Sequence, residues 1–242
     1  MRKILIVITF LLSVFLTNAQ MSFEPINLDI NSPDELQVYK RYTEGKTYIG
    51  LNGGLSIPTA DYSKNIEMGL GLGLHLKYFI TDHFVFGASF NYYKSSFKDK
   101  YIKDLDTMFK TVAMLDTTGL MVLSTDGKST LYPFNVNIEY YFSPLQKFKP
   151  YVGLGIGFYV INHSIEISTN KEKPQFFKEA ESTFGSRLTS DFGFTPYAGF
   201  MLDFNELISM NFDVKYNQIF ATPSAGSLAV NLGLIFNLDF KY

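Results

Sequence analysis

Large apolar residues alternate with small or charged residues, without a break, over residues 67–78. Gly, Glu, His or Lys occupies each odd position, and the even positions are Met68, Leu70, Leu72, Leu74, Leu76 and Tyr78. Side chains of a strand point to opposite faces with a period of two, so the pattern predicts a strand with one apolar and one small or charged face. Twelve residues is long for a soluble strand, whereas a tilted strand that crosses a bilayer needs about 9–11 residues.

The same alternation recurs along most of the chain and predicts eight strands in total. Their expected ranges are 48–58, 67–78, 83–94, 131–142, 151–162, 191–204, 207–218 and 228–242. A few positions break the pattern: Val85, Tyr93 and Ile235 are large apolar residues on the face that is otherwise small or polar.

The connections between these strands alternate in length. Short connections lie at 81–82, 143–149 and 205–206, and longer ones at 59–66, 95–130, 163–188 and 219–227. Short turns at one end and long loops at the other are typical of outer-membrane barrels.

The small face of the strands indicates which side meets the lipid. Glycines on a solvent-exposed face would weaken soluble strands, whereas the interior of an eight-stranded barrel has little room for side chains. We therefore predict an all-β, eight-stranded antiparallel up-and-down transmembrane β-barrel rather than a soluble β-sandwich. The apolar face should touch lipid, so that Arg at Leu72 should be tolerated less well than Ser at Gly71. Aromatic residues should form girdles near both ends of the strands, at Tyr78, Phe79, Phe84, Tyr140, Phe142 and Phe204 and at Tyr92, Tyr132, Tyr216 and Phe220.

The N-terminus has the layout of a secretory signal peptide over residues 1–19. Arg2 and Lys3 precede an apolar run from residue 4 to residue 16, and small or polar residues follow up to Ala19. Residues 20–46 form a periplasmic leader in which Ser32, Pro33 and Glu35 predict the start of a short helix over about residues 34–42. The barrel then occupies residues 47–242.

Composition narrows the possible functions. The 21 basic and 23 acidic residues give a formal net charge of −2, without a basic patch, so nucleic acid is not an expected partner. The chain has no Cys, which excludes disulfides and thiolate chemistry. No cluster has the spacing of metal ligands, and the glycine runs belong to strand faces. We therefore predict no cofactor and no metal.

Three segments carry a resemblance to a known superfamily. They read P-Y-V-G-L-G-I-G-F at 150–158, T-P-Y-A-G-F-M-L-D-F at 195–204 and N-L-G-L-I-F-N-L-D-F-K-Y at 231–242. The chain resembles small outer-membrane β-barrels of the outer-membrane protein W and protein X types and the PorT-like barrels of Bacteroidota. The last segment is similar to the signal by which such chains engage the barrel-assembly machinery, although it ends in Tyr242 rather than Phe. The resemblance implies a location in the outer membrane, among its lipid and lipopolysaccharide, with both termini in the periplasm.

Candidate chemistry is sparse, and we predict no catalytic residues. By alternation, His75 and His83 should point into the lumen. Some eight-stranded barrels modify lipid A with His, Ser and an acidic residue, but His163 and Ser164 are adjacent on a strand and should face opposite sides. The inward charges are more informative, because buried charges must be paired. We expect a lumen charge network of Lys77, Glu139, Asp203, Asp213, Lys215 and Asp239.

The longest loop, 95–130, should be partly ordered. Apolar residues at helical spacing between Tyr101 and Phe109 predict a helix, and the turn at Asp126-Gly127 predicts a small hairpin within 117–130 that extends the fourth strand beyond the membrane. This loop and the loop at 163–188 should be extracellular.

These features predict an integral, non-enzymatic outer-membrane barrel with a closed or narrow polar lumen, either monomeric or part of a larger complex. The resemblance implies passage of small hydrophobic compounds, surface adhesion, or an accessory part in a secretion or surface-assembly complex. A lipid A-modifying enzyme is a further alternative. The extracellular loops offer a site for a protein partner.

Overall fold

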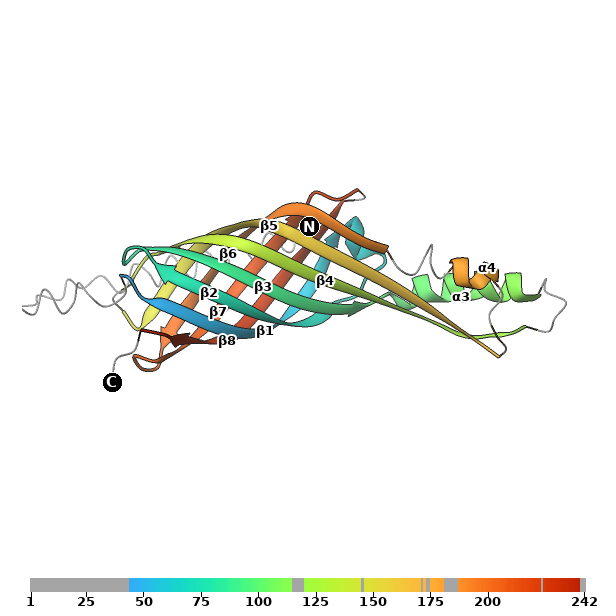
Figure 1. Ribbon diagram of the computed structural model, residues 1–242, viewed down its shortest axis with the longest axis horizontal. Coiled ribbons are helices and arrows are strands. Elements are labelled where there is room, and N and C mark those ends of the chain that lie inside the picture. The colour runs from blue at the N-terminus through green and yellow to red at the C-terminus, as the bar shows by residue number, and fades with distance from the viewer. Residues whose placement is uncertain are drawn as a thin grey trace, which may run out of the picture. The chain divides into compact units, whose positions relative to one another are not determined.

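Eight antiparallel strands close into a barrel in the computed structural model, with each strand paired to its neighbours in sequence and β1 paired to β8 (Figure 1). The structure describes residues 44–114, 120–144, 146–170, 172, 175–180, 187–222 and 224–239. The strands are β1 (Thr47–Ala60), β2 (Gly69–Phe79), β3 (Phe84–Ser96), β4 (Val122–Tyr141), β5 (Phe148–Thr169), β6 (Arg187–Asp203), β7 (Ile208–Ile219) and β8 (Ala225–Asn237). The helices are η1 (Asp61–Lys64), α3 (Asp99–Met114) and α4 (Gln175–Ala180). The predicted fold class is therefore confirmed.

The barrel is apolar outside and polar inside. Leu70 and Leu72 are each 69% exposed, whereas Lys77 is 3% exposed because it lies on the other face of the same strand. A soluble protein buries its apolar face, so this distribution is that of a wall facing lipid.

Inward glycines face large side chains of neighbouring strands. A Cβ atom at Gly50 would overlap the ring of His75, and one at Gly153 would overlap the ring of Tyr197. In each pair the two residues are direct cross-strand partners, as are Gly199 and Tyr151. The glycines therefore make room for lumen side chains, as the alternation predicted.

The interruptions in the alternating pattern are lumen residues. Val85 and Ile235 are completely buried and Tyr93 is 2% exposed. Phe79, which we expected in an outer aromatic girdle, is also completely buried, because it occupies an inward position at the end of β2. His83 was wrongly predicted to point inward: it precedes β3, is exposed, and stacks on Tyr140 with ring centroids 5.6 Å apart.

Strands β4 and β5 are much longer than predicted. Asp126 and Gly127 do not form a turn but pair with Glu166 and Ile165 inside the β4–β5 ladder, so the predicted hairpin within 117–130 is wrong. These residues form a strand because β5 supplies the backbone hydrogen-bond partners for this part of β4. Figure 1 shows β4 and β5 continuing past the other strands, with α3 beside them.

The predicted loop helix is confirmed as α3, and it packs on this extension. The buried residues of α3 pack with residues of β4 and β5 in one hydrophobic cluster. The cluster comprises Ile66, Phe97, Leu105, Phe109, Ala113, Leu120, Val122, Ile165 and Ile167. We call residues 97–114, 120–129 and 163–169 the blade. This cluster is distinct from the lumen cluster around Tyr141 and Tyr151, and Tyr62 of η1 contacts both it and the buried cluster at the long-loop end of the lumen.

The predicted signal peptide, the leader helix and the last residues of the C-terminal assembly signal lie outside the described residues. Among the described residues, no helix is long and apolar enough to cross a membrane.

A charge on the outer wall should destabilise the barrel. We expect Leu72→Arg to lower the free energy of unfolding by about 2–4 kcal/mol, because Leu72 faces the hydrocarbon region. Urea unfolding in lipid vesicles, followed by the mobility shift between folded and heated protein on gels, measures this change.

Glycine substitutions provide the matched control. A Cβ atom at Gly71 would overlap the Tyr92 carbonyl oxygen and the Tyr93 ring, so even a small side chain at this inward position should be destabilising. At the outward Gly53, the nearest atom, Leu72 Cδ2, would lie 3.7 Å away. Gly53→Ala should leave stability unchanged, whereas Gly71→Ala should cost about 1–3 kcal/mol. Equal effects of the two glycine substitutions would contradict the assignment of faces.

Candidate functional site: a buried polar network in the lumen

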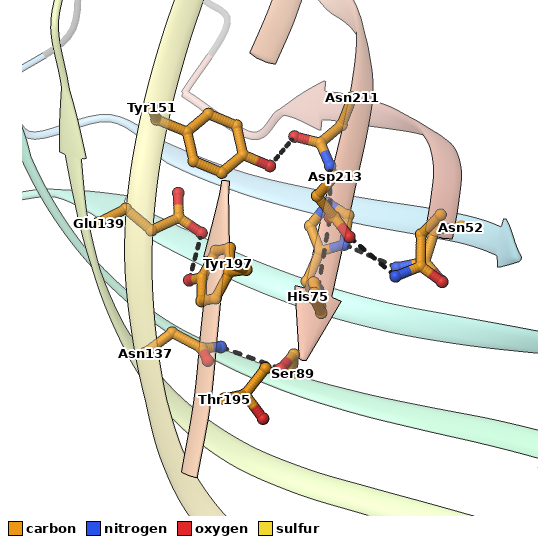
Figure 2. Close-up of polar contacts among 12 residues, drawn as sticks. Asn52, His75, Ser89, Asn137, Glu139, Tyr151, Thr195, Tyr197, Asn211 and Asp213 are labelled. Carbon is orange, nitrogen blue, oxygen red and sulfur yellow. Dashed lines mark hydrogen bonds and ion pairs between the residues drawn. The ribbon is translucent and has the colours of Figure 1, made fainter. Parts of the chain in front are cut away.

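A buried ion pair joins β2 to β4 inside the barrel. Lys77 Nζ lies 2.8 Å from Glu139 Oε2, and their side chains are 4% and 5% exposed. The Tyr141 hydroxyl donates to the same carboxylate oxygen at 3.1 Å. The Tyr197 hydroxyl donates to Oε1 at 2.8 Å (Figure 2). The Lys77 ammonium also lies 4.3 Å from the ring centroid of Tyr151. Both charges are thus surrounded by groups that compensate for the loss of water.

A second carboxylate, Asp213 on β7, extends the network across the lumen. It accepts hydrogen bonds from Asn211 Nδ2 at 3.0 Å and Asn231 Nδ2 at 2.8 Å, and Lys215 Nζ lies 3.4 Å away. Lys77 Nζ donates to Asn211 Oδ1 at 3.4 Å, which connects the two carboxylates. The network therefore ties together strands on opposite sides of the lumen (Figure 2).

The structure brings together four of the six residues predicted for the charge network: Lys77, Glu139, Asp213 and Lys215. Asp203 instead forms an ion pair with Lys149 at 2.6 Å, next to the short turn between β6 and β7. Asp239 follows β8 and accepts a hydrogen bond from the backbone N–H of Thr47. These two residues lie at the short-turn ends of their strands.

Sequence reasoning missed the uncharged members of the network. Tyr141, Tyr151 and Tyr197 all occupy inward positions, as do Asn211 and Asn231. Their place in the alternation marked them as inward, but their partners depend on which strands face each other across the lumen. Lys149 was missed because it was assigned to the turn before β5, whereas it lies within β5 and is 1% exposed.

The other end of the lumen is filled and capped as well. Tyr93, Leu131, Tyr159, Ile161, Ile219, Ala225 and Ala229 form a buried cluster, against which Tyr62 of η1 packs. The Tyr62 hydroxyl is 2.7 Å from Ser129 Oγ, and burial raises the pKa of Tyr62. Buried side chains therefore occupy the lumen both at the level of the carboxylates and at the long-loop end.

The His residues do not form a catalytic arrangement. His75 is 5% exposed and its Nδ1 lies 3.3 Å from Asn52 Nδ2. His163 lies on the inward face between the rings of Tyr62 and Phe97, while Ser164 is exposed on the outer face. Within the described residues, no group of three His, Cys, Asp or Glu side chains is arranged to hold a metal ion.

Comparison with known proteins places the fold. Residues 35–236 match the family described as the outer membrane protein beta-barrel domain. The chain belongs to this family. It is therefore an outer-membrane protein, and its apolar wall contacts membrane lipid. No curated protein matches the chain.

Several solved structures resemble this chain at low sequence identity. Ail of Yersinia pestis, solved in complex with the heparin analogue sucrose octasulfate, is 15% identical, with 81% of this chain and 100% of that chain covered and a TM-score of 0.50. Neisserial surface protein A is 13% identical over 78% of this chain and 96% of that chain, with a TM-score of 0.48. OprG of Pseudomonas aeruginosa is 15% identical over 81% and 97%, with a TM-score of 0.44. The likeness to Ail shows the fold alone, and the other two carry no further argument.

Removing one partner of the central ion pair should strongly destabilise the barrel. Lys77→Met leaves the Glu139 carboxylate buried without its counter-charge, so we expect a loss of about 3–5 kcal/mol in the free energy of unfolding. The double variant Lys77→Met/Glu139→Gln removes both charges and should recover part of that loss. Urea unfolding in vesicles measures all three proteins.

Lys110→Met provides the control, because Lys110 forms an ion pair with Asp106 on the blade and its side chain is 45% exposed. This substitution should change stability by about 0–1 kcal/mol. A similar loss in Lys77→Met and Lys110→Met would show that the lumen pair is not essential to the barrel.

Proposed function

We propose that this protein is a non-enzymatic outer-membrane barrel with a closed polar lumen that binds a protein partner at the cell surface through its blade. The observation that carries the proposal is the contrast between the two parts of the molecule. The lumen is packed with buried side chains, whereas the blade is built around a distinct hydrophobic cluster and exposes apolar groups.

The exposed apolar residues of the blade lie near its tip. Met114 is 83% exposed, Met121 is 62% exposed and Leu123 is 61% exposed. These residues belong to the blade rather than to the lipid-facing wall, so lipid does not account for their exposure. Methionine side chains are flexible and polarizable, which suits a surface that packs against another protein.

The proposal includes an orientation. The blade and the other long loops face outward, and the short turns and both termini face the periplasm. Residues 1–19 serve as the signal peptide, and residues 20–46 as a periplasmic leader. The C-terminal strand engages the barrel-assembly machinery during insertion. The alternation of long and short connections supports this orientation, because outer-membrane barrels carry their longer loops outside.

The filled lumen favours partner binding over the passage of small hydrophobic compounds. The cluster under Tyr62 is apolar, but its side chains pack against one another and Tyr62 covers them. Lipid A modification has less support, because His163 and Ser164 lie on opposite faces of β5. An accessory role in a secretion or surface-assembly complex is one form of partner binding.

The chain has no Cys, so a single introduced Cys can be labelled selectively with a maleimide. Such labelling tests both the orientation and the partner binding. Met121→Cys places a thiol near the tip of the blade, and Gln146→Cys places one at the short turn between β4 and β5. In intact cells, a membrane-impermeant maleimide should label the first variant and not the second. A benzophenone maleimide at Met121→Cys should then give a discrete photo-crosslinked adduct.

Two further results make this experiment decisive. Leu123→Asp in the Met121→Cys background should reduce the adduct while the barrel remains folded on gels. Labelling of Gln146→Cys in intact cells would overturn the orientation. Labelled protein without an adduct in native membranes would overturn partner binding.

The closed lumen predicts very low ion conductance. Wild-type protein in planar bilayers should give no stable channels, because buried rings and the ion pair occupy the lumen. Tyr141 and Tyr151 lie in contact there, with centroids 4.9 Å apart, so Tyr141→Ala/Tyr151→Ala should raise the conductance measurably. Stable channels of about nanosiemens conductance in the wild-type protein would contradict a closed barrel.

A further inference from the structure

We propose that the outward face of β3 and β4, at the base of the blade, binds the phosphate headgroup of an outer-leaflet lipid through Lys94 and Lys128. The site lies where the barrel wall meets the blade and is distinct from the partner surface at the blade tip. It rests on the proposed orientation only in assigning the lipid to the outer leaflet.

The outward residues of these two strands change in polarity along the wall. Phe90 and Phe134 pair directly, with ring centroids 4.6 Å apart, and the rings of Tyr92 and Tyr132 follow at 5.4 Å. Beyond the tyrosines, the next outward positions hold Lys94 and Thr130, followed by Ser96 and Lys128. Tyrosines mark the interface between hydrocarbon and headgroups, so the lysines lie at headgroup level.

The strand register places the two lysines next to each other. Lys94 pairs with Thr130, and Ser96 pairs with Lys128, which makes the lysines diagonal neighbours on one face. Side chains at diagonal positions are within reach of each other when they are as long as Lys. Two ammonium groups can thus contact the same phosphate.

Both lysines are exposed, and within the described residues neither forms an ion pair. Two other exposed lysines do form them: Lys64 lies 2.6 Å from Asp61, and Lys110 lies 2.7 Å from Asp106. Asp126 and Glu166 lie two positions from Lys128 on the same face, but neither forms an ion pair with it, so no carboxylate of the described chain contacts these two adjacent ammonium groups as a counter-ion. An anion bound between them would supply it.

The neighbouring strand adds neutral polar groups. Ser164 and Asn162 of β5 pair with Lys128 and Thr130 on the same outward face. The next outward pair, Asp126 and Glu166, is acidic and would repel a phosphate. The favourable region is thus confined to the membrane side of Asp126, where the headgroup of an embedded lipid lies.

The apolar wall beneath the lysines selects a lipid rather than a free anion. Acyl chains can lie along the Phe90 and Phe134 rings while the phosphate contacts Lys94 and Lys128. The expected ligand is therefore a phosphorylated glycolipid whose chains enter the outer leaflet.

Lipid retention by the full-length protein tests this proposal. Protein reconstituted in phosphatidylcholine vesicles that contain lipid A is extracted, and the retained lipid A is measured by native mass spectrometry. Wild-type protein should retain bisphosphorylated lipid A but not dephosphorylated lipid A. Lys94→Gln/Lys128→Gln should weaken retention by about 30-fold, since each lysine contributes comparably to anionic-lipid attraction.

The matched control is Lys100→Gln/Lys103→Gln, which removes two exposed lysines from α3 and should leave retention unchanged. Equal retention of dephosphorylated lipid A, or unchanged retention in Lys94→Gln/Lys128→Gln, would overturn the proposal. Displacement by equimolar inorganic phosphate would also overturn it, by assigning the site to a free anion. The vesicles contain no protein partner, so this outcome is independent of the blade-tip experiment.

Discussion

The structure depends on filling a closed cylinder that is only eight strands wide. Every second residue of each strand must fit inside it, and large side chains are accommodated where a neighbouring strand supplies a glycine. Gly50 opposite His75 and Gly153 opposite Tyr197 show the arrangement. The same glycines give the strands their pattern of large outward and small inward residues. The limited room inside the barrel thus explains both the packing of the lumen side chains and the alternation of large and small residues along the strands.

Filling the lumen with polar groups creates a second requirement, because a buried charge without a partner is strongly destabilising. Lys77 and Glu139 meet it through their ion pair and the surrounding tyrosine hydroxyls. The resulting network crosslinks the strands and occupies the space that a channel would need. The partner binding that we propose would therefore use the outside of the cylinder, where β4 and β5 extend into the blade.

Strand alternation predicted the barrel and the lipid-facing wall, and helical spacing predicted α3, because the periodicity of apolar residues is a local property of each segment. The alternation was less informative beyond the barrel. It did not predict the outer parts of β4 and β5. Residues 124–130 read S-T-D-G-K-S-T, which is typical of a turn, yet they pair with β5 over their whole length. Strand pairing and the packing of α3 outweigh local turn propensity there.

The candidate site divides in the same way. Inward position was readable from the alternation for Lys77, Glu139, Asp213 and Lys215, while Asp203 pairs with a lysine that had been assigned to a turn. The sequence by itself determined the strands, their two faces and the need for buried charges to find partners. Only the tertiary structure decided which charges meet, because contacts across a barrel depend on register and closure, which join residues far apart in the chain.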